Sequence, residues 1–460
     1  MTRSETTTTE SRRRGACPSA GAAMVTGDGL LSRVRLPGGR ITPQQLASLA
    51  ELAERWGNGE LELTSRGNLQ FRGLTDGGAQ ALTEQLVIMG LAVRSAASEA
   101  ARNVLCSPAA DLDPVAIKDP WPLAREMDAV LSTETDLQAL PAKFRFVLNG
   151  GGTAHLWTQD ADIRADAITT LKGTRYRVAL AGNAYNATPL GLCPPEAVVP
   201  AMLSLARRFL HHREQWLTEV TRLAPILETL GAEAFQLDAL ESLGTGTESL
   251  ARNSRPGPRP GPQPGWFGAA IPFGRFSSQS ARALAQLADT RQLTLRLTPW
   301  RQILLGGASP SVAAELEALD LITHRHDPRL SAVACPGAPD CLSGTTATRE
   351  HALHWAEQVP ALFDGHLVVH VSGCSKGCAR PRPAPVTLTA RDGHYDLILN
   401  DRADPATPDA VLCQDLAPEA VTRWLQDLAA LLQRHRQGEE PLAAVIRRLE
   451  PSDIRAELTG

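Results

Sequence analysis

Four cysteines in the C-terminal third of the chain have the spacing of iron–sulfur cluster ligands. They form two pairs, Cys335-x5-Cys341 and Cys374-x3-Cys378, in the contexts ACPGAPDCLSG and VSGCSKGCARP. Loops this rich in Gly, Pro and Ser turn tightly and expose backbone N–H groups, which can hydrogen-bond thiolates and cluster sulfides. The pattern therefore predicts a [4Fe-4S] cluster held by these four thiolates.

Two other interpretations of the four cysteines stay open on spacing alone. Structural zinc favours short C-x2–4-C knuckles, and neither pair here has the C-x2-C spacing. Unconnected core cysteines are the third possibility, although buried cysteines seldom gather in Gly/Pro loops. Disulfides are not expected in a cytoplasmic protein of this size. Cys193 and Cys413 are interpreted as core thiols, and Cys17 as a pocket residue or part of a flexible segment.

The composition predicts a water-soluble protein of two to four domains. The chain has 460 residues, of which 43% are hydrophobic and 21% charged. A net charge of −4 and an aromatic content of 4% argue against a nucleic-acid partner. No apolar run could span a membrane, and the polar, Thr-rich start lacks the apolar core of a signal peptide. We therefore expect a disordered tail over 1–20, a cytoplasmic location and no membrane contact.

A duplication organises the chain on either side of a Pro/Gly-rich linker, RPGPRPGPQPG, at 255–265. Residues 38–73 and 273–307 both contain a Gly-Arg pair, then an Ala/Leu-rich helix, then an alternating strand. The two strands read LELTSRGNLQF and LRLTPWRQILL. Similarity of this kind predicts one β-α-β unit that occurs twice.

The repeat continues into the cysteine loops. ARNVLCSPAADL at 101–112 aligns with LSAVACPGAPDCL at 330–342, which places Cys106 on Cys335 and Leu112 on Cys341. FVLNGGGTAHL at 146–156 aligns with VHVSGCSKGCA at 369–379, so that Gly151 and His155 fall on the other two cysteines. The first half thus keeps the loops but has lost three of the four ligands. Its loops are expected to shape a ligand pocket across a pseudo-two-fold axis.

These motifs resemble the sulfite/nitrite reductase family over roughly residues 22–450. The resemblance implies an α+β fold with two ferredoxin-like half-domains and two reductase-type α/β domains around a pseudo-two-fold tetrapyrrole pocket. The expected segments are the tail 1–20, half-domain 21–98, cluster-free domain 99–254, linker 255–265, half-domain 266–322 and cluster domain 323–460.

The resemblance also assigns roles to basic residues. LPAKFRF matches the lysine-rich strand of the reductases, with Lys143 on its first lysine and Arg145 in place of its second, and implies that both are catalytic. Arginine is a poor proton donor, but its guanidinium binds carboxylates well through two parallel hydrogen bonds. TSRGNLQ implies that Arg66 binds the tetrapyrrole, and ARNVLC implies the same for Arg102 and Asn103. An isolated arginine would otherwise be interpreted as a surface charge.

Two further cations are candidates for substrate binding. Arg301, in TPWRQ, lies one residue from the position equivalent to Arg66 in the repeat. Lys376 lies inside the cluster loop, where its charge would tune the cluster potential, unless it simply faces water.

Within the family, the opening segment GACPSAGAAMVTGDGLLSRVRLPGGR and the motif ACPGAPDC resemble the precorrin-3B synthases. This branch implies an O2-dependent monooxygenase of cobalamin biosynthesis that hydroxylates precorrin-3A at C-20 and closes a γ-lactone. It implies a [4Fe-4S] cluster, a mononuclear non-haem iron and no sirohaem. No nucleotide fingerprint is visible, so an external electron donor is expected. A monomer is expected because the duplication supplies an internal pseudo-dimer.

Two other functions stay open. A sirohaem-dependent sulfite or nitrite reductase would share the fold and cluster, with Cys378 bridging cluster and haem iron. An iron–sulfur electron carrier or tetrapyrrole chaperone is the non-enzymatic alternative.

Ligands for a mononuclear iron are the least constrained prediction. Oxygen-activating iron often uses two histidines and one carboxylate, and His324, His326 and Asp327 offer these types just before the cluster loop. His155 and His370 are further candidates. Each histidine could equally be structural or exposed.

Overall fold

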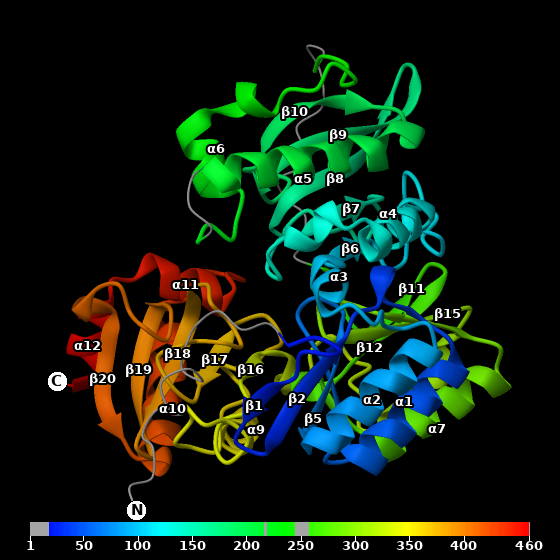
Figure 1. Cartoon of the computed structure of the whole chain (residues 1–460). Helices are drawn as coiled ribbons and strands as arrows, with labels where there is room; N and C mark the ends of the chain where they lie inside the picture. The colour runs from blue at the N-terminus through cyan, green and yellow to red at the C-terminus, as the bar shows by residue number, and fades with distance from the viewer. Residues whose placement is uncertain (1–17, 216–218, 244–256, 460) are drawn as a thin grey trace, which may run out of the picture.

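The computed structural model describes residues 18–215, 219–243 and 257–459, which form four five-stranded sheets covered by helices (Figure 1). Most of the predicted tail, Cys17 and the first two residues of the predicted linker lie outside this part of the chain. Within the described part, no helix is long and apolar enough to cross a membrane. The architecture is α+β and duplicated, as the sequence predicts.

The two ferredoxin-like units each contain an antiparallel sheet. The first has the order β1-β2-β5-β4-β13 and the second β11-β12-β15-β14-β3. The strands of the first are β1 (Met24–Thr26), β2 (Gly29–Val34), β5 (Leu69–Leu74), β4 (Glu60–Leu63) and β13 (Arg275–Ser277). Those of the second are β11 (Gly261–Gln263), β12 (Trp266–Ala270), β15 (Gln302–Gly306), β14 (Thr294–Leu297) and β3 (Arg40–Ile41).

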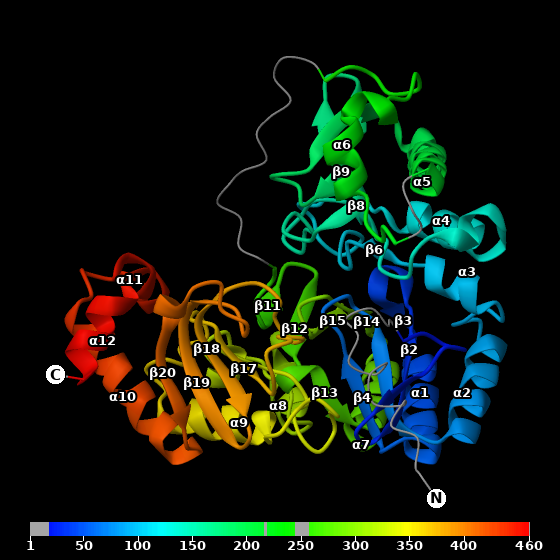
Figure 2. The ribbon, with the colours of Figure 1, turned by 60° about the vertical axis from the view of Figure 1, so that its left-hand side comes forward.

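Each ferredoxin-like unit lends a strand to the other. β3 comes from the first half of the chain but pairs with β14, with Arg40 opposite Arg296. In return, β13 pairs with β4, with Arg275 opposite Glu62. Figure 2 shows β3 beside β14 where the two units meet. The exchange joins the two halves through backbone hydrogen bonds.

The helices of the two units begin and pack in the same way. Thr42 caps α1 (Pro43–Trp56) with a capping box to Gln45, and Ser277 caps α7 (Ser278–Thr290). Each helix buries four apolar residues at positions i, i+3, i+4 and i+7, which form a single stripe, and α7 also buries Ser278 at its start. These two helices and α2 (Asp76–Ile88) lie on one side of the molecule (Figure 1), and one hydrophobic core contains residues from both units.

The predicted alternating strands are hairpins. β4 and β5 are antiparallel neighbours joined by a turn at 64–68, and β14 and β15 are joined in the same way at 298–301. Arg66 and Arg301 lie in these turns. The expectation of one continuous strand in each repeat was wrong because it missed the turn residues Gly67 and Pro299.

The other two domains share one topology, β10-β9-β8-β7-β6 and β20-β19-β18-β17-β16, with two parallel and two antiparallel pairings in each. Their strands are β6 (Val104–Cys106), β7 (Phe146–Asn149), β8 (Ala161–Thr170), β9 (Gly173–Gly182), β10 (Thr188–Cys193), β16 (Ala332–Ala334), β17 (Val369–Ser372), β18 (Ala384–Arg391), β19 (His394–Asp401) and β20 (Val411–Leu416).

Helices cover these sheets and connect them to the ferredoxin-like units. In chain order they are α3 (Ala96–Ala101), α4 (Trp121–Thr133), α5 (Val198–Gln215), α6 (Ala224–Leu230), α8 (Ala313–Glu317), α9 (Thr348–Gln358), α10 (Pro418–Arg434), α11 (Leu442–Arg448) and α12 (Pro451–Thr459).

The Pro/Gly-rich segment predicted as a linker contributes structure. Gly261–Gln263 forms the edge strand β11, which pairs with β12. Proline is tolerated there because an edge strand leaves one side of its backbone unpaired.

Candidate iron–sulfur and tetrapyrrole site

A cavity of about 530 Å³ lies between the first ferredoxin-like sheet and the cysteine loops. All four predicted cluster cysteines line it, and so do three of the predicted basic residues. The charged, amide and thiol side chains that line it include Arg33, Glu62, Gln70, Arg72, Lys143, Arg301, Cys335, Asp340, Cys341, Arg349, Cys374, Lys376 and Cys378.

Parallel pairing brings the two cysteine loops together. β16 and β17 are parallel neighbours, with Ala334 opposite Val371. Cys335 follows the first strand directly, and Cys374 follows the second after one glycine. Because both strands end at the same edge of the sheet, motifs about thirty residues apart meet there.

The backbone around Cys335 suits a cluster ligand. Its Sγ accepts a hydrogen bond from the Gly373 N–H at 3.1 Å. A Cβ at Gly373 would lie 3.2 Å from the Cα of Gly337 and 3.4 Å from that Sγ, so the loops approach too closely for a larger residue. Burial, and then the neighbouring cysteines, raise the pKa of the Cys378 thiol above its usual range. These features fit a [4Fe-4S] cluster, because binding of the iron ions would displace the thiol protons and leave thiolate ligands.

No three His, Cys, Asp or Glu side chains in the described ranges are close enough to share a single metal ion. The Cys-x5-Cys and Cys-x3-Cys spacings, in loops that meet at one sheet edge, suit a cluster better than a zinc knuckle.

The hydrogen-bond register corrects the predicted alignment of the repeat. Cys335 donates its N–H to the Val371 carbonyl, and the residue that donates to the equivalent Leu148 is Ser107, not Cys106. Ser107 Oγ also accepts the Gly150 N–H at 2.9 Å, as Cys335 Sγ accepts that of Gly373. The sequence alignment matched two cysteines, but the backbone is shifted by one residue.

The same shift places Asp113, not Leu112, on Cys341, because Ala116 and Gly344 donate to their respective carbonyls at 3.0 Å. The first half has therefore lost all four ligands. Cys106 is a core thiol, 1% exposed.

A polar network supports the first-half loops. Asn149 accepts from Ser107 Oγ at 3.0 Å and donates to Asp166 at 2.9 Å. Asp166 pairs with Arg164 at 2.7 Å, and both side chains are fully buried. The Asp113 carboxylate accepts both the N–H and the hydroxyl of Thr153, which ties one loop to the other. Direct hydrogen bonds thus join the two loops of the first half, at the place where the equivalent loops of the second half carry the four cysteines.

Lys143 and Arg301 face the cavity without polar side-chain partners among the described residues. Burial, and then the charge of Arg349, lower the pKa of the Arg301 guanidinium. Lys376 also lines the cavity and donates to Ser343 Oγ at 2.9 Å, which links the two cysteine loops.

Arg66 and Arg145 lie near one another but not among the residues lining this cavity. Burial, followed by the charges of Arg66 and Arg222, lowers the pKa of Arg145 to about 9. The Arg145 side chain donates to the Asp160 carbonyl at 3.0 Å. The structure thus places these two predicted residues close together, and Arg145 is two residues from Lys143 in the chain.

Arg102 and Asn103 have structural partners in the described chain. Arg102 is 5% exposed, forks onto Asp128 at 2.8 and 2.9 Å, and pairs with Glu99 at 2.7 Å. Asn103 donates to the Phe144 carbonyl at 2.7 Å. Arg102 lines a different cavity, of about 560 Å³, that is not lined by the cysteines.

The three predicted iron ligands do not come together. His324 is 79% exposed and contacts Glu317, whereas Asp327 pairs with Arg329 at 2.8 Å. His326 accepts from Arg325 at 3.0 Å. Within the described residues they do not form a three-ligand site.

His155 and His370 occupy different surroundings. His155 stacks on Trp157, with ring centroids 4.0 Å apart. His370 is fully buried beneath the cluster loop, and neither ring nitrogen has a hydrogen-bond partner in the described structure. Burial, and then the charges of Arg380 and Arg301, lower its pKa to about 4.

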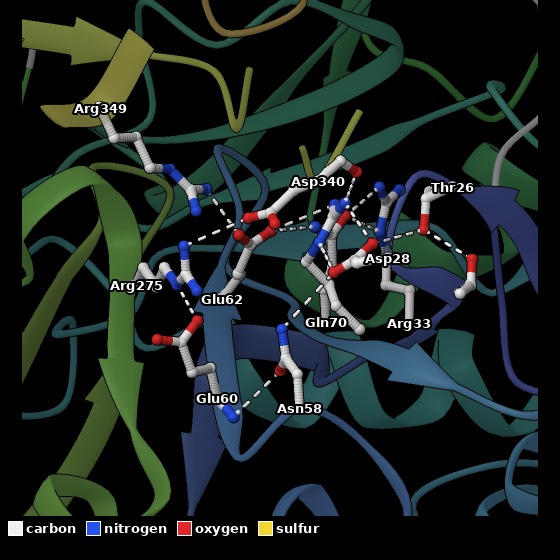
Figure 3. A network of polar contacts seen from close by, with 12 residues as sticks. Thr26, Asp28, Arg33, Asn58, Glu60, Glu62, Gln70, Arg275, Asp340 and Arg349 are labelled. Atoms are coloured by element: carbon white, nitrogen blue, oxygen red, sulfur yellow. Dashed lines mark hydrogen bonds and ion pairs between the residues drawn. The ribbon is translucent and has the colours of Figure 1, made fainter. Parts of the chain in front are cut away.

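Sequence reasoning missed a polar network on the cavity wall (Figure 3). Gln70 lies opposite Glu62 on β4 and β5, and donates to it at 3.1 Å. Arg349 donates to the same carboxylate at 2.5 Å, and Arg33 to the Gln70 side chain at 2.6 Å. The signal was alternation: in LQFRG the core residues Leu69 and Phe71 alternate with Gln70 and Arg72, which puts both polar side chains on the cavity face.

Comparison with known proteins agrees with this arrangement. Residues 23–87 and 259–319 each match the nitrite/sulfite reductase ferredoxin-like half domain. The chain is 30% identical over 459 residues to the precorrin-3B synthase of a Sinorhizobium species, covering 98% of this chain and 95% of that protein. The chain belongs to the sulfite/nitrite reductase family, together with precorrin-3B synthase.

Reductases of the family are also similar. The ferredoxin–nitrite reductase of Synechococcus elongatus is 27% identical over 449 residues, covering 87% of this chain and 86% of that protein. The structure of Mycobacterium tuberculosis NirA superposes with a TM-score of 0.74 at 19% identity, covering 92% of this chain and 84% of that one. The latter shows that the fold is shared.

Proposed function

We propose that this member of the family is an oxygen-dependent monooxygenase that converts precorrin-3A to precorrin-3B, with hydroxylation at C-20 and γ-lactone formation, in cobalamin biosynthesis. The observation that carries the proposal is a single cavity lined by four cysteines and by Lys143 and Arg301, whose side chains make no hydrogen bond or ion pair within the described structure. The full-length similarity to precorrin-3B synthase supports precorrin-3A as the substrate among the tetrapyrroles that the fold could hold.

The substrate is a tetrapyrrole with eight acetate and propionate groups. Lys143 and Arg301 would pair with its carboxylates, each contact contributing about 1.5–3 kcal/mol. Arg66 and Arg145 would bind carboxylates beyond the cysteine-lined part of the cavity. Arg102 and Asn103 would support the fold of the adjoining loop through the partners they already have.

Cys335, Cys341, Cys374 and Cys378 would hold the [4Fe-4S] cluster. Such a cluster transfers single electrons, which would come from an external donor. The described residues offer a mononuclear iron no site with three His, Cys, Asp or Glu ligands.

The sirohaem-dependent reductase is the second candidate, favoured by the similarity to ferredoxin–nitrite reductase. It would use the same cations to bind and protonate a small anion, and it requires a tightly bound chromophore.

Anaerobic purification followed by a visible spectrum, tetrapyrrole extraction, and iron and sulfide counts separates the two. We expect broad iron–sulfur absorbance, no sirohaem, and about four irons per chain for the cluster alone. A fifth iron per chain would indicate a mononuclear iron site in addition to the cluster, whose ligands would then have to be identified. Turnover of precorrin-3A under O2 completes the test. One sirohaem per chain and no turnover would establish the reductase instead.

A further inference from the structure

The first ferredoxin-like sheet contacts the backbone of the loop between Cys335 and Cys341 directly. The Gly27 N–H, at the tip of the β1–β2 hairpin, donates to the Asp340 carbonyl at 3.2 Å. A Cβ at Gly27 would lie 2.1 Å from the Pro339 carbonyl oxygen and 3.0 Å from the Cys341 nitrogen. Only glycine therefore fits this contact, which lies directly beside a predicted cluster ligand.

The positively charged guanidinium of Arg72 contacts the same carbonyl group, that of Asp340. Arg72 is 4% exposed, and its guanidinium donates to the Asp340 carbonyl. Asp28 holds the guanidinium through a fork at 2.9 and 3.1 Å, and Glu62 lies 3.9 Å away. Burial opposes the charged form, but Glu62 and Asp28 outweigh it and raise the pKa of Arg72. Arg72 is thus a fixed cation beside the loop.

The second half of the chain holds Asp340 from the other side. Arg275, on the exchanged strand β13, pairs with the Asp340 carboxylate at 3.3 Å and with Glu60 (Figure 3). Both halves of the duplication therefore converge on the residue before Cys341.

This arrangement acts on the Asp340–Cys341 peptide. A charge-assisted hydrogen bond to its carbonyl polarises the peptide group and orders the loop. A positive charge and an ordered dipole near a cluster stabilise its reduced form, which carries one more negative charge.

We propose that Arg72 is a positioning residue that fixes the Cys341 loop and raises the reduction potential of the cluster held there. The inference rests on one part of the proposed function, namely that the four cysteines hold a [4Fe-4S] cluster. It names no role for Arg72 toward the tetrapyrrole.

The test is a redox titration of anaerobically purified full-length protein, monitored by electron paramagnetic resonance, with iron and sulfide counts. Arg72→Gln should lower the midpoint potential by about 59 mV, a tenfold change in the one-electron equilibrium. Arg72→Lys, which keeps the charge but loses the fork, should shift it less. Gly27→Ala, which separates hairpin from loop but keeps the arginine, should also lower the potential or release iron.

Two matched controls should leave both quantities unchanged. Arg282→Gln removes another arginine–carboxylate pair between the halves, with Glu54, and Gly77→Ala adds a methyl group where nothing lies within 4 Å. An unchanged potential with full iron content in Arg72→Gln would overturn the inference, whatever Gly27→Ala does, and would leave the proposed function intact. Wild-type protein without iron or sulfide would overturn both.

Discussion

The side chains of Lys143 and Arg301 line the cavity and make no hydrogen bond or ion pair within the described structure, although the charge of Glu62 acts on Arg301. Arg102, by contrast, is satisfied by two carboxylates. A half-buried cation without a counter-ion is unfavourable unless a ligand supplies one. At the residue scale, pairing state therefore distinguishes binding groups from structural ones better than motif membership does.

Replacing either unpaired cation should weaken tetrapyrrole binding. Lys143→Met and Arg301→Gln should each raise the dissociation constant of a stable octacarboxylate porphyrin about tenfold, which is about 1.4 kcal/mol. Fluorescence titration measures the constant. Lys172→Met is the matched control, because that lysine is 73% exposed and pairs with Glu241 away from the cavity. Equal affinity in all three variants would remove both residues from the binding site.

At the scale of elements, the two halves stabilise equivalent loops by different means. β16 and β17 end in loops that carry the four thiols, while β6 and β7 end in loops joined by Ser107, Asn149 and Asp166. The buried Arg164–Asp166 ion pair beneath the β6 and β7 loops is needed for them to fold, because removing one partner leaves the other charge buried and unpaired.

Asp166→Ala should therefore lower the free energy of unfolding by about 3–5 kcal/mol. Asp136→Ala is its control, because Asp136 pairs with Arg207 where both side chains are nearly half exposed, and such pairs contribute less than about 1 kcal/mol. Urea denaturation measures both changes. A loss of less than 1 kcal/mol for Asp166→Ala would show that the buried pair is dispensable.

His370, on β17, should make the protein sensitive to acid. Its pKa is about 4 in the folded chain against 6.5 ordinarily, so the unfolded state binds a proton first as pH falls. Stability should be lost between pH 6.5 and pH 4, by about 3 kcal/mol in total.

His370→Leu should remove this loss, and the exposed His394→Leu should not. Denaturation midpoints at pH 7 and pH 4.5 compare the variants with the parent protein. An unchanged acid sensitivity in His370→Leu would contradict the assignment.

At the scale of the whole molecule, the duplication is interlocked. β3 and β13 are each paired in the sheet of the other half, and one hydrophobic core spans both ferredoxin-like units. Neither half can complete its sheet alone, so the cavity exists only when both are present.

Fragments 1–250 and 251–460 should therefore be insoluble when expressed separately and should copurify when coexpressed. Size-exclusion chromatography of the coexpressed pair should give one peak containing both fragments. Two soluble, separately folded fragments would show that the strand exchange is not needed for folding.

The sequence by itself determined the family and the duplicated α+β fold, because motif spacing and repeat similarity are local features that can be recognised without coordinates. It predicted four cysteines as cluster ligands and Lys143, Arg301 and Lys376 as site residues, and all seven line one cavity. The tertiary structure alone decided the one-residue register that places Ser107 on Cys335, since hydrogen bonding between strands is not visible in letter matching. It decided the exchange of β3 and β13, and the contact of Arg72 with Asp340, 268 residues away. Long-range pairing depends on which surfaces meet after folding, and no local pattern records that.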